Sequence, residues 1–337
     1  MDAAAPSAKR PIRVGIVLIC VVALLAALWL AREIVLLGFL GILIAVVFSF
    51  PVGWLSRVLP RGLAVIAVLL ALVGGTVGLG LLIAPTLSRE YDELKKRAPA
   101  AIEKARDYVS RSPGGQQLAQ RGPEAVKKAG EKAVPAFLAL VSGITGIVLV
   151  IVLGAFLVGQ PDVYRRGVRS LIPHAHEEEF DESWKRVGGA LRRWVGGILV
   201  AMTIMGTLTA VGLKIAGIEE WFLLGVLTFL GTFVPYVGAV ASAVPGLLAA
   251  LAQSPRHALY AAVVYLGVHI VEGYLVEPLV MRRAVEIKPA LLLFGQGIFS
   301  AVFGLMGTVV ATPLIVCGQT LIDYLWVERK LAKTPTK

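Results

Sequence analysis

The sequence has little charge and almost no cysteine. Only 16% of its 337 residues are charged, 57% are hydrophobic, and the mean hydropathy is +0.79. A soluble domain usually carries about 25% charged residues, so this composition excludes nearly every class of soluble enzyme and indicates a membrane protein. The two cysteines, Cys20 and Cys317, lie inside apolar runs, so no disulfide framework is expected.

Motifs of catalysis and metal binding are also missing. The chain has no His-Glu-x-x-His, no Gly-x-Ser-x-Gly and no phosphate-binding glycine loop ending in Lys-Ser/Thr. The run from His174 to Glu179 contains two histidines and three glutamates, but no second ligand cluster follows at a fixed spacing. We therefore predict no enzyme activity, no metal, no cofactor and no ATP-driven transport by this chain alone.

The net charge of +11 has a membrane explanation. The Lys and Arg residues cluster beside apolar runs, which is how membrane proteins fix their orientation. We therefore expect the lipid bilayer, and not a nucleic acid, as the partner of these basic residues.

Long apolar runs dominate what is present. A membrane span needs about 20 apolar residues. Full spans are predicted for 14–31, 34–50, 62–84, 134–159, 194–216 and 258–276. The first run is too long, and too closely followed by the second, for a cleaved signal peptide.

Two further runs do not fit a single span. Residues 221–251 would make about 46 Å of helix and residues 289–325 about 55 Å, and each is interrupted, at 232–238 and at 303–307. Paired interrupted segments are a sequence sign of a transporter's binding site. The predicted fold is an all-α multi-pass membrane protein with about six full transmembrane helices and two broken or re-entrant helical hairpins. A simple hydropathy count gives eight spans.

Two polar segments divide the apolar runs. In 85–133, apolar residues recur every three to four positions, which is typical of an amphipathic helix. A helical cap on the membrane surface is favoured over a gating or partner-binding domain. The predicted organisation is a three-span unit (1–84), an extracytoplasmic helical segment (85–133), a fourth span (134–159), a cytoplasmic polar segment (160–193), a transport unit with broken helices (194–326) and a cytoplasmic basic tail (327–337).

The distribution of basic residues predicts that both termini are cytoplasmic. With six spans and two hairpins, Arg282 and Arg283 also lie inside, whereas eight spans would place them outside. The basic residues of 85–133 lie outside in either arrangement, against the rule.

One helix carries ionisable groups within an apolar run. Tyr265, His269 and Glu272 share one helical face, and Glu277 follows before Pro278. Such groups are costly in a membrane and are functional by default, so they are candidate ligands for a solute, Na⁺ or H⁺. The structural alternative is a His–Glu pair that only ties this helix to its neighbours.

The two interruptions supply the remaining candidates. Thr232 and Tyr236, with unwound backbone around them, could bind a small polar solute. The predicted break or hinge residues are Pro235, Gly238, Pro245, Gly304, Gly307 and Pro313. A kink used only for packing is the alternative.

Three motifs resemble the autoinducer-2 exporter family. They are Gly231-Thr-Phe-Val-Pro235-Tyr-Val-Gly238, the run from Val271 to Met281 with Glu272, Glu277 and Pro278, and Phe303-Gly304-Leu-Met-Gly307 followed by Ala-Thr-Pro313. The resemblance covers nearly the whole chain. It departs at His269, Tyr274 and Arg282, where the family often has Gln, Asn and Gly.

The resemblance implies a multi-pass carrier of the bacterial inner membrane. Such carriers export autoinducer-2 or exchange sodium or lithium for protons. It also implies a homo-oligomer, with a pentamer among the forms considered.

The leading hypothesis is a secondary carrier of a small polar solute. A sodium or lithium/proton antiporter is the second hypothesis, and a non-transporting membrane scaffold is the alternative from another class. A scaffold has no need of two interrupted apolar segments, which favours the carrier.

Overall fold

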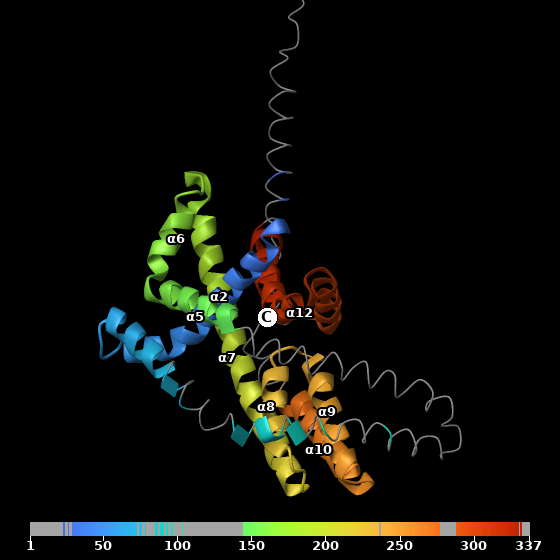
Figure 1. Cartoon of the computed structure of the whole chain (residues 1–337). Helices are drawn as coiled ribbons and strands as arrows, with labels where there is room; N and C mark the ends of the chain where they lie inside the picture. Colours follow the sequence, from blue (N-terminus) through green and yellow to red (C-terminus); the bar gives the residue numbers. More distant parts are fainter. Residues whose placement is uncertain are drawn as a thin grey trace, which may run out of the picture.

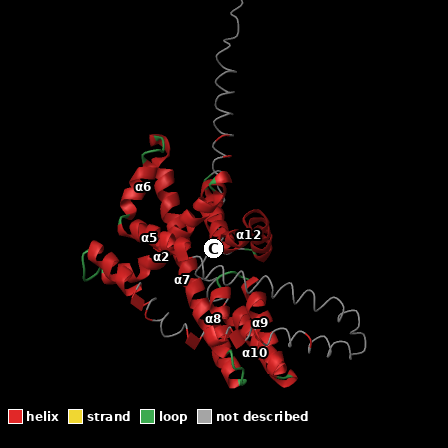
Figure 2. Ribbon diagram, in the orientation of Figure 1, coloured by secondary structure: helices red, strands yellow, loops and turns green. Residues whose placement is uncertain are grey.

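The computed structural model describes residues 29–72, 144–235, 237–276 and 288–329, together with isolated residues between 23 and 103 and Leu331. Helices joined by short loops make up these parts, and no strand occurs in them (Figure 2). The all-helical prediction is confirmed there. Most of the predicted first span and of the polar segment 85–133 lies outside the described residues.

The longest helix organises the others. The helix α7 (Glu177–Ile215) contacts α2 (Arg32–Leu55), α8 (Trp221–Gly231), α10 (Pro255–Val271) and α12 (Pro289–Ile322) (Figure 1). Its first half is polar and its second half apolar. The predicted boundary between a polar segment and a fifth span at 193/194 is therefore not a break in the backbone.

The N-terminal helices pack closely on one another. Helix α2 lies against α5 (Ile144–Gly159), with Gly41 facing Leu153 and Gly154 facing Ile44. Small residues at such contacts let membrane helices approach closely. After α2 comes the apolar helix Arg61–Leu72, and after α5 come α6 (Pro161–Arg169) and the 3₁₀ turn η1 (His174–His176).

The first interrupted run forms a helical hairpin, called hairpin A here. It consists of α8 and α9 (Val237–Gln253), and the chain reverses between the end of α8 and the start of α9. The helices meet at Gly231 and Gly238, where each backbone lies against the other. At the open end, Gln253 Nε2 donates to Glu220 Oε2 at 3.2 Å. With 11 residues, α8 is only about 16 Å long, too short to cross a bilayer.

The second interrupted run also folds back, forming hairpin B from the two arms of α12. Gly304 leaves helical geometry, with φ 62° and ψ −145°. Gln296 Nε2 then donates to Thr312 Oγ1 at 3.3 Å, although these residues would be about 24 Å apart on a straight helix. Gly307 lies against the carbonyl of Phe299, so the arms are in backbone contact near the turn.

The two hairpins open toward opposite ends of α7. Hairpin A begins just after Ile215, whereas the π-helical turn η3 (Asp323–Glu328), which follows hairpin B, is paired with Arg186. Arg186 and Ile215 are separated by about 44 Å along the helix. The open ends of the two hairpins therefore lie near different ends of α7.

The polar segment 85–133 reaches hairpin A through Glu90. Its Oε2 accepts a hydrogen bond from the backbone N–H of Leu223, in the first turn of α8, at 2.6 Å. Burial is the largest influence on this carboxyl and raises its pKa, and the charge of Glu220 adds to the rise. Glu90 thus caps a helix N-terminus that has no side-chain cap of its own.

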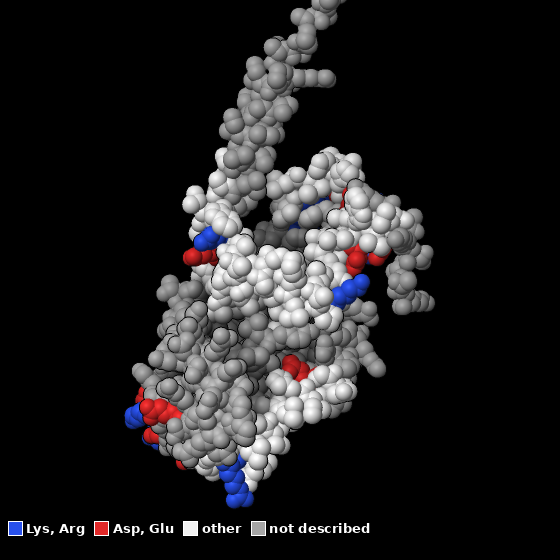
Figure 3. Space-filling view, turned by 90° about the vertical axis from the view of Figure 1, so that its right-hand side faces the viewer, with Lys and Arg blue, Asp and Glu red and all other residues white. Residues whose placement is uncertain are grey.

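Among the residues that the structure describes, three helices are long and apolar enough to cross a membrane by length and composition. They are Arg32–Leu55, His174–Ile215 and Pro289–Glu328. The third contains the reversal at Gly304. Most of the described surface in Figure 3 is uncharged, with Lys, Arg, Asp and Glu in small separate groups.

Candidate functional site

The candidate site is centred on a His–Glu pair where α10 ends. Helix α10 ends at Val271, and Glu272 begins the π-helical turn η2 (Glu272–Val276). His269 Nδ1 lies 3.0 Å from Glu272 Oε2, and the two side chains are 37% and 31% exposed. The contact is an ion pair if the imidazole is protonated and a hydrogen bond if it is neutral.

Tyr265 shares the helical face of this pair but has a different environment. Its side chain is 5% exposed, and its hydroxyl donates to the carbonyl oxygen of Ser242 in α9 at 3.2 Å. Gly246 lies directly against the ring and leaves no room for a Cβ. Tyr265 therefore joins α10 to hairpin A.

Removing this hydroxyl tests the joining role. Tyr265→Phe is expected to lower the free energy of unfolding by about 1 kcal/mol, because it removes a buried hydrogen bond between α10 and α9. Thermal unfolding in detergent measures the loss. The matched control is Tyr274→Phe, since the Tyr274 side chain is 81% exposed. Equal stability of the two variants would contradict this role.

The turn of hairpin A packs on α7. Phe233 contacts Trp194 edge to face, with ring centroids 5.7 Å apart. The Thr232 hydroxyl donates to the carbonyl of Thr228 at 2.7 Å, so its oxygen keeps acceptor capacity while its proton is used. Pro235 lies in the turn, and Gly238 is buried at the start of α9. Tyr236 and Glu277 lie outside the described residues.

A single apolar cluster brings the hairpins and the pair together. Val268 and Val276, on either side of His269 and Glu272, belong to the same core cluster as Trp194. Leu292 and Val316, one from each arm of hairpin B, also belong to this cluster. Phe233 of hairpin A packs against it. The turn of hairpin A, the neighbours of the His–Glu pair and the base of hairpin B therefore share one cluster, which runs along α7 from Ala190 to Met205.

The predicted residues of hairpin B are distributed differently. Gly304 and Gly307 lie at its turn, near the start of α2, where Phe303 contacts Trp29 with ring centroids 6.2 Å apart. A cavity of about 280 Å³ beside this turn is lined by Arg32, Glu33 and Gly304 among others. Pro313, and Pro245 in hairpin A, lie inside helical backbone rather than at a reversal.

Sequence reasoning missed the charged network at the base of hairpin B. Arg186 of α7 binds both Glu182 and Glu328, the latter at 2.7 Å, and Arg329 pairs with Glu179. The guanidinium of Arg186 lowers the pKa of the Glu182 carboxyl. The pairing of Glu182 with Arg186 follows from their i, i+4 spacing in the sequence. Nothing in the sequence links Arg186 to Glu328, which lies far along the chain.

The histidine–glutamate run on η1 and α7 forms local pairs. His174 Nδ1 contacts Glu177 Oε1 at 2.6 Å, and His176 Nδ1 contacts Glu179 Oε2 at 3.0 Å. Throughout the described part of the chain, no group of three or more His, Cys, Asp or Glu side chains is placed to hold a metal ion.

Comparison with known proteins identifies the family. The profile described as "AI-2E family transporter" matches residues 18–326. The chain is 24% identical to YueF of Bacillus subtilis over 80% of this chain and 78% of that protein. It is 27% identical to MT0215 of Mycobacterium tuberculosis over 91% and 88% of the two chains, and 23% identical to YhhT of Escherichia coli K12 over 95% and 91%. All three are named only as candidate transport proteins, with no substrate. This chain thus belongs to the AI-2E transporter family and is a membrane transport protein rather than an enzyme.

Proposed function

We propose that the protein is a secondary carrier of a small polar solute, with its site between the two hairpins. The observation that carries the proposal is the apolar cluster around Trp194, which joins the turn of hairpin A and the base of hairpin B beside His269 and Glu272. Short helices that end inside a membrane leave backbone donors and acceptors at their turns, where a polar solute can bind.

The opposed hairpins suit alternating access. The open end of hairpin A follows Ile215 and that of hairpin B lies near Arg186, so we expect the two hairpins to cover the site from different sides. Protonation or ion binding at the His–Glu pair changes the charge between them, and this biases which side is open. A scaffold protein needs none of this arrangement.

The proposed topology has about six full spans and two re-entrant hairpins. A cytoplasmic position of that end is supported by the positive-inside rule, since α6 and the first half of α7 carry seven basic residues (Arg165, Arg166, Arg169, Lys185, Arg186, Arg192, Arg193). Both termini then lie in the cytoplasm and segment 85–133 outside. A bacterial inner-membrane location and a homo-oligomer belong to the same proposal, as the resemblance of the three sequence motifs implies.

Solute export is the first choice and cation/proton antiport the second. The second is kept because His269 and Glu272 form an ionisable pair rather than two neutral ligands. In an antiporter the carboxylate would bind Na⁺, Li⁺ and H⁺ in turn.

Neutralising the carboxylate tests the site. Glu272→Gln is expected to lower flux in proteoliposomes at least about tenfold, because an amide cannot carry the charge of a coupling ion. Autoinducer-2 efflux and sodium uptake driven by an imposed pH gradient are measured separately. The control is Glu178→Gln, an exposed position on the polar half of α7.

The two assays separate the alternatives. Loss of autoinducer-2 efflux supports the exporter, and loss of sodium uptake supports the antiporter. Unchanged flux in folded Glu272→Gln protein would overturn the role of this carboxylate. Native protein that is inserted but moves neither solute would contradict both choices.

A further inference from the structure

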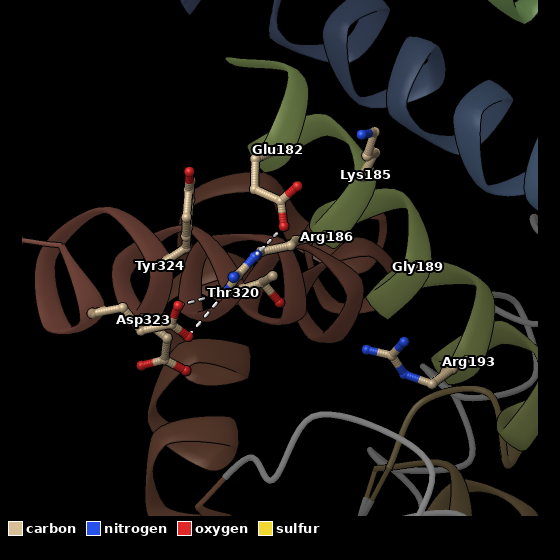
Figure 4. Close-up of a pocket in the computed structure, with 9 residues that line it drawn as sticks. Glu182, Lys185, Arg186, Gly189, Arg193, Thr320, Asp323 and Tyr324 are labelled. Carbon is tan, nitrogen blue, oxygen red and sulfur yellow. Dashed lines mark hydrogen bonds and ion pairs between the residues drawn. The ribbon is translucent and has the colours of Figure 1, made fainter. Parts of the chain in front are cut away.

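A separate pocket lies between the polar half of α7 and the end of α12. Its volume is about 440 Å³, which is within the range of small-ligand sites. Figure 4 shows side chains from α7 facing side chains from α12 and η3 across it. None of its lining residues belongs to the site proposed for transport.

On one wall of the pocket, the charged side chains are paired with one another. The Arg186 guanidinium binds Glu182 at 2.8 Å and both carboxylate oxygens of Glu328 at 2.9 and 2.7 Å. It also lies over the Tyr324 ring, 4.3 Å from the centroid. These groups form a fixed wall and are not free to pair with a ligand.

Three charged side chains of the lining remain, Lys185 and Arg193 on α7 and Asp323 on the facing η3. Arg193 extends from α7 into the space between the helices, and Asp323 comes from η3 (Figure 4). Within the part of the chain that the structure describes, neither side chain has an ion pair within 4 Å or a side-chain hydrogen bond. A ligand that satisfies both must carry an anionic and a cationic group.

The surroundings place the pocket at the edge of the apolar region. Arg193 directly precedes Trp194, which is buried in the core cluster. Next to Asp323, Ile322 is 60% exposed and Trp326 is 54% exposed. An exposed Trp beside exposed aliphatic groups is typical of the membrane–water interface, where lipid headgroups lie.

We propose that this pocket binds the headgroup of phosphatidylethanolamine. Arg193 holds the phosphate, because the planar guanidinium matches phosphate oxygens with two parallel hydrogen bonds. Asp323 accepts from the primary ammonium group, and Ile322 and Trp326 lie along the acyl chains. This inference concerns binding alone and is independent of the proposed transport cycle.

Lipid binding to the purified full-length protein tests the proposal. Short-chain phosphatidylethanolamine, phosphatidylcholine and phosphatidylglycerol are titrated by native mass spectrometry and by thermal stabilisation. We expect phosphatidylethanolamine to bind about tenfold tighter than the other two. Phosphatidylcholine has no N–H to donate to Asp323, and phosphatidylglycerol has no cation.

Two variants assign the roles. Arg193→Gln should weaken all three lipids about tenfold, through loss of a charge-assisted phosphate contact. Asp323→Asn should remove the preference for phosphatidylethanolamine over phosphatidylglycerol while phosphate binding remains. The controls are Arg256→Gln and Asp162→Asn, which change the same charges at exposed positions outside the pocket.

Several results would overturn the proposal. Equal binding of the three lipids, or variants indistinguishable from their controls, would remove the headgroup assignment. Water-soluble phosphoethanolamine that binds as tightly as the lipid would replace the lipid with a free zwitterionic phosphate as the ligand.

Discussion

Gly238→Ala is expected to disrupt hairpin A, with a loss of about 3 kcal/mol in the free energy of unfolding. A Cβ at Gly238 would overlap the carbonyl oxygen of Gly231, and backbone cannot move aside as a flexible side chain can. Relieving the overlap would separate α8 from α9 and withdraw Phe233 from Trp194. Both stability and flux should therefore fall.

The measurement is the thermal midpoint and the monodisperse yield in detergent. The control is Gly267→Ala on α10, where an added Cβ meets nothing within 4 Å. In an open helical position this exchange stabilises by up to about 1 kcal/mol, so the two variants should shift in opposite directions. Similar midpoints for both would show that the Gly231–Gly238 contact is not close in the folded protein.

Gly304→Ala is expected to lower the stability of hairpin B by about 2 kcal/mol, for a different reason. The added Cβ meets nothing within 4 Å, so the cost is not a clash. It comes from φ 62° and ψ −145°, a backbone conformation that only glycine adopts readily. Asparagine should not rescue the turn, because its tolerance is for left-handed helical geometry with positive ψ.

Gly297→Ala is the matched control, in the helical part of the same arm and also with open space around it. Thermal unfolding of both variants, with labelling of a single cysteine at Phe303 as a reporter of the turn, measures the effect. If Gly304→Ala is as stable as Gly297→Ala, the reversal at Gly304 is not the native conformation.

The sequence predicted the helical class and the two interruptions because each depends on local information. The length of an apolar run is read directly from the sequence. A run of 31 residues is longer than the about 20 that one span needs, and this comparison requires no knowledge of tertiary structure. The reversals fall between the end of α8 and the start of α9 and at Gly304, within the segments marked by proline and glycine. Pro245 and Pro313 show the limit, since proline inside a membrane helix can be accommodated by its neighbours.

The candidate site was predictable only in part. His269 and Glu272 lie three residues apart on one helix, so their contact follows from helical geometry. The burial of Tyr265 against hairpin A could not be predicted from the sequence, because it depends on where α9 lies. The same is true of Arg186, whose partner Glu328 is joined to it only by the way hairpin B returns to α7.

The continuity of α7 has a mechanical consequence. Its 39 residues form one rod about 58 Å long, with a charged half outside the core cluster and an apolar half within it. Because the helix continues without a break through its middle, a displacement of the charged half is expected to carry Trp194 with it. The ion pairs Arg186–Glu328 and Glu179–Arg329 join that half to η3 and to the residue after it. A change of charge at these pairs is therefore expected to shift the turn of hairpin A, because Phe233 packs on Trp194.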